Sequence, residues 1–321
     1  MENRRLGRTG LHVSALGLGT MTWGRETDAQ DAAEQLRDFT DAGGTLVDTA
    51  GSYADGASEE ILGSLLGSAV HRDDLVLCTK GGLRQTARGT VVDSSRRALL
   101  TDLDASLARL GTDHVDLFLV QAPDLGTPLD ETVDALSHAV TSGRALYVGL
   151  SNHGAWHTGY VAGRLSQVDG VTLAAVEVEH SLLARALEDD VVPAAQALGV
   201  GVIGWSALGR GVLTGKYRGG VPAGSRGASA QLAGFVEPYL GEAASSVVDA
   251  VCTAAAGLGR EPLEVALAWL LERDYLGSAV VGARTPGQLR AALGAVDLVL
   301  PPAVSLALDD VSADDRESAR A

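Results

Sequence analysis

Eight copies of one pattern run along this chain: a short apolar run, a polar loop, and then apolar residues at helical spacing. Most of the runs lack polar–apolar alternation, as expected for parallel strands that are buried on both faces. The helical segments, such as DAAEQLRDFTDAGG, tend to end near a glycine, which is a common helix stop. Strands are predicted at residues 15–20, 45–48, 75–80, 115–121, 145–151, 174–178, 200–205 and 278–282.

Eight strand–helix units predict a fold of the α/β class, the (β/α)8 or TIM barrel. Such a barrel takes about 250 residues, so a chain of 321 residues has three extra segments. They are an N-terminal stretch (1–14), a Gly-, Ala- and Ser-rich loop (217–240) and a tail (312–321) that lacks a core pattern and is expected to fray. The loop has the length of a lid over a cofactor or substrate, or of a surface excursion.

We expect a single domain over residues 1–321, because no linker divides the chain. A doubly wound sheet fits less well, since no GxGxxG turn follows the first run. The formal net charge of −16 argues against nucleic acid or an anionic membrane as a partner and favours a small molecule. No Cys/His spacing suits a metal. With no leader-like or membrane-length apolar run, we expect a cytoplasmic protein.

Three polar residues close successive apolar runs: Asp48 in TLVD, Lys80 in LVLCTK and Gln121 in VDLFLVQ. Tyr53 follows the first of these runs in the loop TAGSY. In a barrel, the carboxyl ends of strands and the loops after them carry the catalytic groups. Because side chains alternate along a strand, an inward Lys80 places Cys78 beneath it inside the barrel.

A lysine beside a tyrosine favours the phenolate and lowers the phenol pKa from its reference of about 10. An aspartate paired with that lysine keeps the lysine charged and in place. Tyr53 next to Lys80 and Asp48 would then be a general acid that gives up a proton near neutral pH. The same residues are also compatible with a plain Asp–Lys ion pair and a surface tyrosine.

Seven segments stand in order along the chain: LGRTGLHVSALGLGT, DTAGSY, TKGG, DLFLVQAPD, GLSNH, GVIGWSALGRGVLTGKY and VVGARTPGQL. With these segments the chain resembles the aldo-keto reductases, which are NADPH-dependent barrels, over nearly its whole length, and especially their bacterial and potassium-channel β-subunit-like branches. The resemblance implies that Tyr53 is the proton donor and that Lys80 and Asp48 tune it. The family usually has a histidine where this chain has Gln121, whose amide can donate a hydrogen bond to the substrate oxygen but cannot titrate.

The resemblance also implies how the nicotinamide is held. Ser151 and Asn152 would bind its amide, although such residues also serve as turns or helix caps. Glu177 replaces a common glutamine, and a carboxylate accepts hydrogen bonds but cannot donate them. Trp205 would stack on the ring, with a core tryptophan as the alternative.

The phosphates of the cofactor would lie further along the same face. The segment SALGRGVLTGK (206–216) would wrap the pyrophosphate with backbone N–H groups and Lys216. Arg284 and the helix start after it would bind the adenosine 2′-phosphate, which favours NADPH over NADH. The full predicted cofactor set is Thr20, Met21, Ser151, Asn152, Glu177, Trp205, Ser206, Leu208, Gly209, Gly211, Lys216, Arg284, Thr285 and Gln288.

We therefore expect NADPH-dependent reduction of an aldehyde, ketone or dicarbonyl, with Tyr53 as the proton donor. Trp23 and Trp156 lie in loops beside the expected substrate mouth and are candidates for its wall, or ordinary packing residues. One alternative is a ketoreductase for a keto sugar or a polyketide-type ketone in a specialised pathway. An alternative of another class is a slow NADPH-binding redox sensor or regulatory subunit, in which Gln121 only packs. The acidic surface is compatible with a monomer or a homo-oligomer.

Overall fold

Eight parallel strands close into one barrel in the computed structural model, which describes residues 1–86, 89–229 and 232–318. The predicted (β/α)8 barrel is confirmed, and each predicted run forms one barrel strand. The strand order around the barrel is β10-β11-β12-β3-β4-β5-β8-β9. The strands are β3 (Leu16–Gly19), β4 (Leu46–Asp48), β5 (Val76–Gly81), β8 (Val115–Val120), β9 (Ala145–Ser151), β10 (Leu173–Glu179), β11 (Gly201–Trp205) and β12 (Leu276–Gly282).

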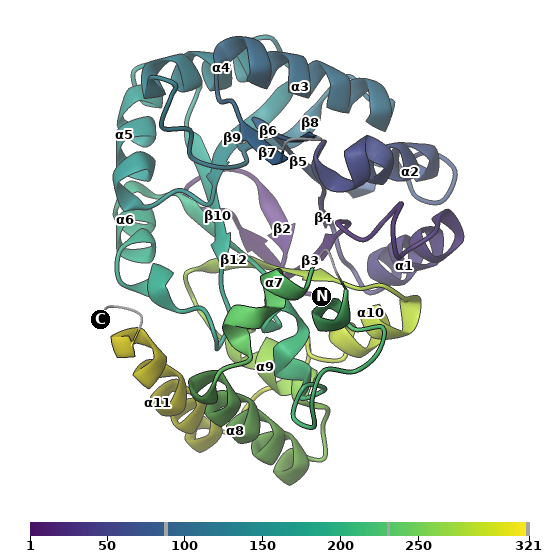
Figure 1. Cartoon of the computed structure of the whole chain (residues 1–321). Coiled ribbons are helices and arrows are strands. Elements are labelled where there is room, and N and C mark those ends of the chain that lie inside the picture. The colour runs from purple at the N-terminus through teal and green to yellow at the C-terminus, as the bar shows by residue number, and fades with distance from the viewer. Residues whose placement is uncertain (87–88, 230–231, 319–321) are drawn as a thin grey trace.

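Helices form a ring around the barrel, as Figure 1 shows. Their ends follow local sequence signals: Asp28 caps the amides that begin α1, and Gly111 ends α3 in a left-handed conformation. No described helix is long and apolar enough to cross a membrane. The helices are α1 (Ala29–Asp41), α2 (Ala57–Leu65), α3 (Arg96–Leu110), α4 (Leu129–Thr141), α5 (Ala155–Leu165), α6 (Val191–Leu198), α7 (Ala233–Val236), α8 (Glu242–Leu258), α9 (Pro262–Leu271), α10 (Pro286–Leu293) and α11 (Pro302–Ser318).

The interior of the barrel is an apolar cluster that lies beneath the polar strand ends. Cys78 and Leu119 belong to it, two residues before Lys80 and Gln121 along the chain. The predicted alternation is therefore confirmed, because Cys78 and Lys80 share the inner face of β5. The polar groups lie on this apolar layer, and its low dielectric makes the electrostatic interactions between them stronger than they would be in water.

Two short hairpins lie outside the barrel. β1 (Asn3–Arg5) and β2 (His12–Ser14) pair antiparallel, and the turn between them buries Leu6 beside the first residues of β11. This hairpin closes the barrel at the amino ends of its strands. β6 (Leu83–Thr86) and β7 (Gly89–Val92) form the second hairpin, which follows β5 on the opposite side.

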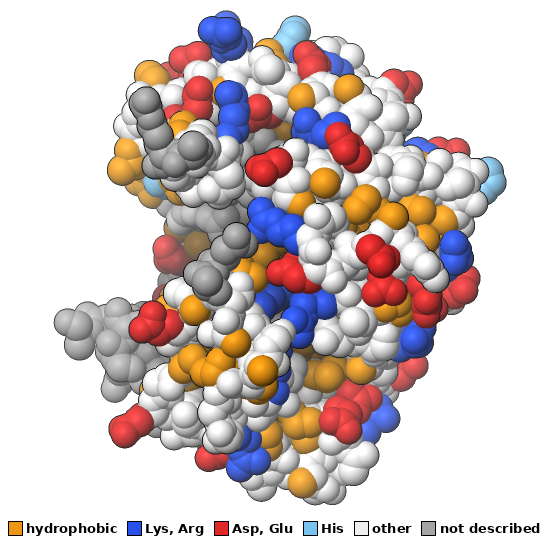
Figure 2. Space-filling view, turned by 45° about the vertical axis from the view of Figure 1, so that its right-hand side comes forward, with side chains coloured by type: hydrophobic (Ala, Val, Ile, Leu, Met, Phe, Trp, Pro, Cys, Tyr) orange, Lys and Arg blue, Asp and Glu red, His pale blue; other side chains and the backbone are white. Residues whose placement is uncertain are grey.

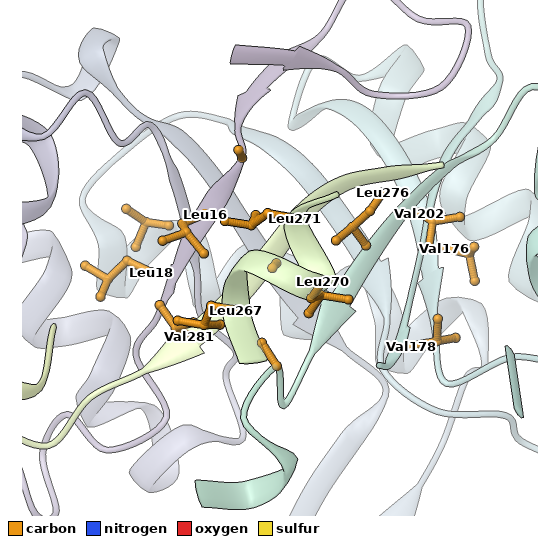
Figure 3. Close-up of a cluster of buried hydrophobic side chains, with 14 of the residues drawn as sticks. Leu16, Leu18, Val176, Val178, Val202, Leu267, Leu270, Leu271, Leu276 and Val281 are labelled. Atoms are coloured by element: carbon orange, nitrogen blue, oxygen red, sulfur yellow. The ribbon is translucent and has the colours of Figure 1, made fainter. Parts of the chain in front are cut away.

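A larger apolar cluster fills the layer between the strands and the helices. Figure 3 shows the part around α9, where Leu267 and Leu270 lie against Leu276 and Val281 of β12. All residues of α9 from 265 to 271 are buried, because α8, α10 and the barrel contact it from several sides. A helix that is apolar all round is typical of such a position.

The loop 217–240 is an ordered excursion in its described residues, with short helical turns at Arg226–Ala228, α7 and Glu237–Tyr239. Arg210 ties it to the barrel. Its guanidinium pairs with Glu179 at 2.6 Å, lies 3.9 Å from the ring of Phe235, and donates a hydrogen bond to the Phe235 carbonyl. The loop is thereby held close to the carboxyl end of β10.

The helix α11 extends to Ser318 and so includes the first part of the tail 312–321 that is expected to fray, and residues 319–321 lie outside the described chain. Ser312 is buried and its hydroxyl accepts a hydrogen bond from Arg185 at 2.7 Å. Asp309 accepts one from the Trp269 indole at 3.1 Å. Polar contacts at Asp309 and Ser312 therefore hold this helix to Trp269 and Arg185, and fraying of the residues after Ser312 stays a prediction.

His180 lies in the same region, has no exposed surface, and sits 2.9 Å from the Tyr275 hydroxyl. Burial lowers the pKa of His180 to about 4. An unfolded histidine titrates near 6.5, so the unfolded state takes up a proton first and stability is lost as the pH falls below that value. We expect His180 to lower the free energy of unfolding by about 2 kcal/mol between about pH 7 and about pH 5.

Urea unfolding of the wild type and of His180→Gln at these two pH values measures this contribution. The fall in unfolding free energy on acidification should be smaller in the variant by the stated amount. Equal falls in the two proteins would contradict the assignment, whatever the absolute stability of the variant.

Candidate active site

A pocket of about 500 Å³ opens at the carboxyl ends of the barrel strands. Figure 2 shows Lys and Arg side chains gathered beside a hollow on one face of the molecule. All eight strands contribute to the lining, at or near their ends. The following residues, one for each strand in the order of the chain, line the pocket: Gly19, Asp48, Lys80, Gln121, Ser151, Glu177, Trp205 and Gly282.

Asp48, Tyr53 and Lys80 meet in this pocket as the sequence predicts. The Lys80 ammonium contacts the Asp48 carboxylate directly, donates to the Thr49 carbonyl at 3.2 Å, and lies 3.4 Å from the Tyr53 hydroxyl. Lys80 is 2% exposed and Asp48 is 3% exposed. A buried ammonium held by a carboxylate and a carbonyl is fixed in position, so its charge acts on the phenol from a constant distance.

The electrostatic balance at Tyr53 differs from the expectation. Burial raises the pKa of Tyr53, and this outweighs the lowering by Lys80, while Asp48 and Glu177 raise it further. Burial works against the charge of Lys80, yet the two carboxylates raise the pKa of Lys80 well above its ordinary value. The prediction of a lowered phenol pKa was therefore wrong, because it counted the lysine and omitted desolvation. Tyr53 keeps its proton and Lys80 keeps its charge.

Gln121 is held by a residue that the sequence did not single out. The Ser52 hydroxyl donates to Gln121 Oε1 at 3.0 Å. Among the described residues, Gln121 Nε2 has no hydrogen-bond partner, so its donor is free to face the pocket. No spacing rule connects positions 52 and 121, and only the fold brings the loop after β4 beside the end of β8.

Asn152 joins the ends of three strands. Its side-chain amide donates to the Gln121 carbonyl at 2.9 Å and to the Ser151 hydroxyl at 3.1 Å, and it accepts from the Trp205 indole at 3.0 Å. Trp205 is thereby anchored at the pocket wall by its N–H, which leaves the face of its ring available for stacking.

Strained backbone is concentrated around the pocket. In the described chain, the non-glycine residues with positive φ are Ala54, Asp55, Asn152, Ser206 and Arg210. The first two directly follow Tyr53, and the others follow the ends of β9 and β11. Such conformations cost about 1–3 kcal/mol each and are typical of functional sites. The backbone around the pocket therefore lowers the stability of the fold locally.

Three cations line another part of the pocket: Lys216, Arg226 and Arg284. Burial lowers the pKa of Lys216 and of Arg226, and repulsion by Arg284 lowers both further, while the more distant Glu26 carboxylate raises the pKa of Arg226. Within the described residues none of the three has a carboxylate within 4.0 Å. Cations left unpaired in a cavity favour an anionic ligand such as a phosphate group.

This chain is similar to known proteins over most of its length. A family model described as "Aldo/keto reductase family" matches residues 15–313. This chain belongs to the aldo/keto reductase family. This aldo/keto reductase is 33% identical to "Uncharacterized oxidoreductase YrpG" of Bacillus subtilis, over 97% of its own length and 96% of that protein. It is 34% identical to "L-glyceraldehyde 3-phosphate reductase" of Escherichia coli, over 90% and 86%.

A relative with a different kind of name matches equally well. The "Putative voltage-gated potassium channel subunit beta" of Schizosaccharomyces pombe is 32% identical over 96% of this chain and 92% of that protein. The resemblance seen in the sequence, including its potassium-channel-like branch, is confirmed. Membership of the family, together with oxidoreductase-named relatives, makes this chain an oxidoreductase.

Most of the residues predicted for the site of this aldo/keto reductase do line the pocket. They are Met21, Asp48, Tyr53, Lys80, Gln121, Ser151, Asn152, Glu177, Trp205, Ser206, Leu208, Gly211, Lys216, Arg284 and Gln288. Sequence reasoning missed Arg210, Arg226 and Phe235, which also line it. The last two lie in the loop 217–240, whose small-residue composition gave no periodic signal.

The two tryptophans proposed for the substrate wall lie elsewhere. Trp23 has no exposed surface and donates its indole N–H to Gln35 at 3.0 Å, so it is a core residue. Trp156 is 66% exposed on α5, where it stacks on Tyr160 with ring centres 5.7 Å apart. The prediction that both tryptophans line the substrate pocket was wrong. It rested on their location after a strand end, which does not specify the direction of a side chain.

Three predicted cofactor residues serve the fold instead of the pocket lining. Thr20 is buried and accepts a hydrogen bond from the Ser58 hydroxyl at 2.7 Å. Thr285 caps α10 by accepting from the amide of Gln288. Gly209 is buried and adopts a left-handed conformation, and a Cβ there would lie only 2.8 Å from a leucine methyl.

The glycine-rich segment 206–216 offers fewer free amides than expected. The amides of Gly209 and Gly211 donate to carbonyls within the segment, and the amide of Arg210 donates to the Ser206 hydroxyl. Gly211 has φ of 90°, and a Cβ there would lie 3.0 Å from Lys216 Nζ. The glycine at position 211 therefore leaves room for Lys216 at the pocket. The Lys216 ammonium is the main group of this segment that could bind an anion.

Proposed function

We propose that this chain catalyses NADPH-dependent reduction of a carbonyl group in an aldehyde, ketone or dicarbonyl, with Tyr53 as the proton donor. The observation that carries the proposal is the position of the Tyr53 hydroxyl, 3.4 Å from a Lys80 ammonium that is buried against Asp48. A phenol that loses a proton in a buried site needs a fixed positive charge beside it. Lys80 supplies that charge.

The residues around the pocket suit both the nicotinamide end and the phosphate end of NADPH. Trp205 presents an aromatic ring in the same pocket as Tyr53, and Lys216, Arg226 and Arg284 form a cationic cluster with no carboxylate within 4.0 Å in the described chain. The cluster suits the phosphates, and its guanidinium groups suit a 2′-phosphate. When bound, NADPH supplies the hydride that adds to the carbonyl carbon.

The protein supplies the proton and orients the oxygen. Tyr53 holds a proton at Oη and transfers it to the carbonyl oxygen as that oxygen gains negative charge, which yields an alcohol. Lys80 stabilises the phenolate that forms, and solvent returns a proton to Tyr53 later. The free amide of Gln121, oriented by Ser52, donates a hydrogen bond to the same oxygen.

Arg226 provides a test of the cofactor assignment. We expect Arg226→Met to weaken NADPH binding by about 10- to 100-fold, as expected for the loss of a charge-assisted hydrogen bond to a phosphate. NADH lacks the 2′-phosphate, so its affinity should change by less than about threefold. Fluorescence titration with both cofactors measures the two effects.

Arg218→Met is the matched control, because Arg218 pairs with Asp249 on the exposed surface. It should leave both affinities unchanged. Equal weakening of NADPH and NADH in Arg226→Met would show that Arg226 does not recognise the 2′-phosphate.

Ser52 provides a test of the role of Gln121. We expect Ser52→Ala to lower kcat/KM by about fivefold, because the amide loses the hydrogen bond that orients it. The affinity for NADPH should not change. Ser64→Ala, at an exposed position of α2, is the control. Unchanged kcat/KM in Ser52→Ala would mean that Gln121 is oriented without its help.

The proposal as a whole is tested by NADPH consumption with a panel of aldehydes, ketones, dicarbonyls and enones, with NADPH binding followed in parallel by fluorescence. Turnover of carbonyls supports it. Tight binding without turnover on any of them would favour a second candidate function, a redox-sensing or regulatory subunit. Two observations favour that candidate: Gln121 cannot titrate, and burial raises the pKa of Tyr53.

A further inference from the structure

Lys80 faces two buried carboxylates, one more than a single ammonium neutralises. Its Nζ contacts Asp48 directly and lies 3.4 Å from Glu177 Oε2. Glu177 is 2% exposed, and its Oε2 has no partner with hydrogen-bonding geometry among the described residues. Two carboxylates and one lysine would leave a net negative charge inside the protein, which is costly.

The groups that face Glu177 come from several elements. β11, on one side of β10, has no titratable residue in its sequence, and β9 on the other side contributes a hydroxyl. Across the barrel mouth lie an ammonium, a carboxyl, a phenol and a thiol. These facing residues are Ser151, Lys80, Asp48, Tyr53 and Cys78. Lys80 is the single cation among them.

The geometry decides which carboxyl carries the extra proton. Burial raises the pKa of both Asp48 and Glu177, and Lys80 lowers both. Lys80 is in direct contact with Asp48 and further from Glu177, so its charge favours ionised Asp48 more strongly. Burial and the charge of Asp48 raise the pKa of Glu177 to about 8.

We propose that Glu177 is a positioning residue that carries a proton at neutral pH, so that Lys80 stays paired with Asp48 and no second negative charge stands near Tyr53. This inference rests on the proposed function. A neutral carboxyl also both donates and accepts hydrogen bonds, as an amide does, and can therefore present a donor to the pocket that a carboxylate lacks.

The consequence is a pH limit on proton transfer. Below about pH 8, Glu177 is neutral and Lys80 acts on Tyr53 with only Asp48 opposing it. Above that pH a second negative charge develops near the phenol and raises the pKa of Tyr53 further, so Tyr53 becomes a weaker acid. Turnover should therefore fall on the alkaline side as Glu177 loses its proton.

Glu177→Gln keeps the shape and stays neutral at every pH. Two measurements test the proposal on the full-length wild type, this variant, and Glu242→Gln as an exposed surface control. The first is an infrared titration of the free protein, in which a protonated carboxyl absorbs apart from a carboxylate. The second is the pH profile of kcat for a carbonyl substrate between about pH 6 and about pH 10.

In the wild type and the control, we expect a protonated carboxyl signal that disappears near pH 8 and is missing from Glu177→Gln. The alkaline fall in kcat should move up by at least about one pH unit in Glu177→Gln. A wild type without the infrared signal, or identical alkaline limbs, would overturn the proposal. The infrared titration needs no turnover, so it decides the protonation of Glu177 even if the protein reduces none of the carbonyls. Failure of the proposed function can therefore be distinguished from failure of this proposal.

Discussion

Replacing Tyr53 by phenylalanine is expected to lower kcat for carbonyl reduction by about 100- to 10,000-fold, the usual contribution of a general acid. The phenyl ring keeps the shape of the pocket, so NADPH affinity should stay within about twofold. The physical reason lies in the buried group: Tyr53 Oη is 3.4 Å from Lys80 Nζ, and no other hydroxyl hydrogen-bonds to this ammonium in the described chain. Steady-state kinetics and fluorescence titration of the variant give the two values.

Tyr160→Phe is the matched control, because Tyr160 lies on α5 and donates to Asp130 at the surface. It should retain full activity. If Tyr53→Phe kept more than about a tenth of the wild-type kcat, Tyr53 would not be the proton donor, and water or another group would have to supply the proton.

Replacing Lys80 by methionine is expected to have the largest combined effect on stability and activity. The change leaves Asp48 without its partner in a buried site, and breaking a buried ion pair in this way costs about 3–5 kcal/mol. It also removes the charge that stabilises the Tyr53 phenolate, so turnover should fall at least about 100-fold. Urea unfolding and kinetics on the folded fraction measure the two effects.

The double variant Asp48→Asn with Lys80→Met separates stability from catalysis. Neutralising the stranded carboxylate should recover most of the lost free energy of unfolding, while turnover stays low. Recovery of turnover along with stability would show that Lys80 acts only as a structural partner of Asp48. Undiminished turnover in the single variant would exclude Lys80 from the chemistry.

The barrel could be predicted because its strands obey a strong rule. A run buried on both faces is apolar throughout, so a polar residue at or next to its end marks where the strand leaves the core, as at Asp48 and Lys80. Because the carboxyl ends of all barrel strands meet at one mouth, those residues had to be neighbours. Alternation along β5 then placed Cys78 beneath Lys80 correctly.

The site residues that were not predicted from the sequence have one physical cause in common. They are brought together by contacts between segments that are far apart along the chain. Arg226 and Phe235 lie in a loop without periodicity, and only its fold against the barrel mouth brings them to the pocket. Ser52 meets Gln121 across two loops. The tyrosine pKa was misjudged because the depth of burial, which outweighs Lys80, appears only once the chain is folded.

Pattern also says little about side-chain direction in loops. Trp23 turns into the core to reach Gln35, whereas Trp156 turns outward onto Tyr160. Both follow a strand end and looked equivalent in sequence. The acidic side chain of Glu177 was visible in the sequence where the family commonly has a glutamine, but its role depends on sharing Lys80 with Asp48.

The most direct test of hydride transfer to a carbonyl uses NADPH with deuterium at the transferable position of the nicotinamide. The purified protein is incubated with this cofactor and a carbonyl from the panel, and the alcohol is analysed by mass spectrometry. The account predicts one deuterium on the former carbonyl carbon in the wild type and hardly any product with Tyr53→Phe. An unlabelled alcohol, or no alcohol from any carbonyl despite bound NADPH, would contradict it.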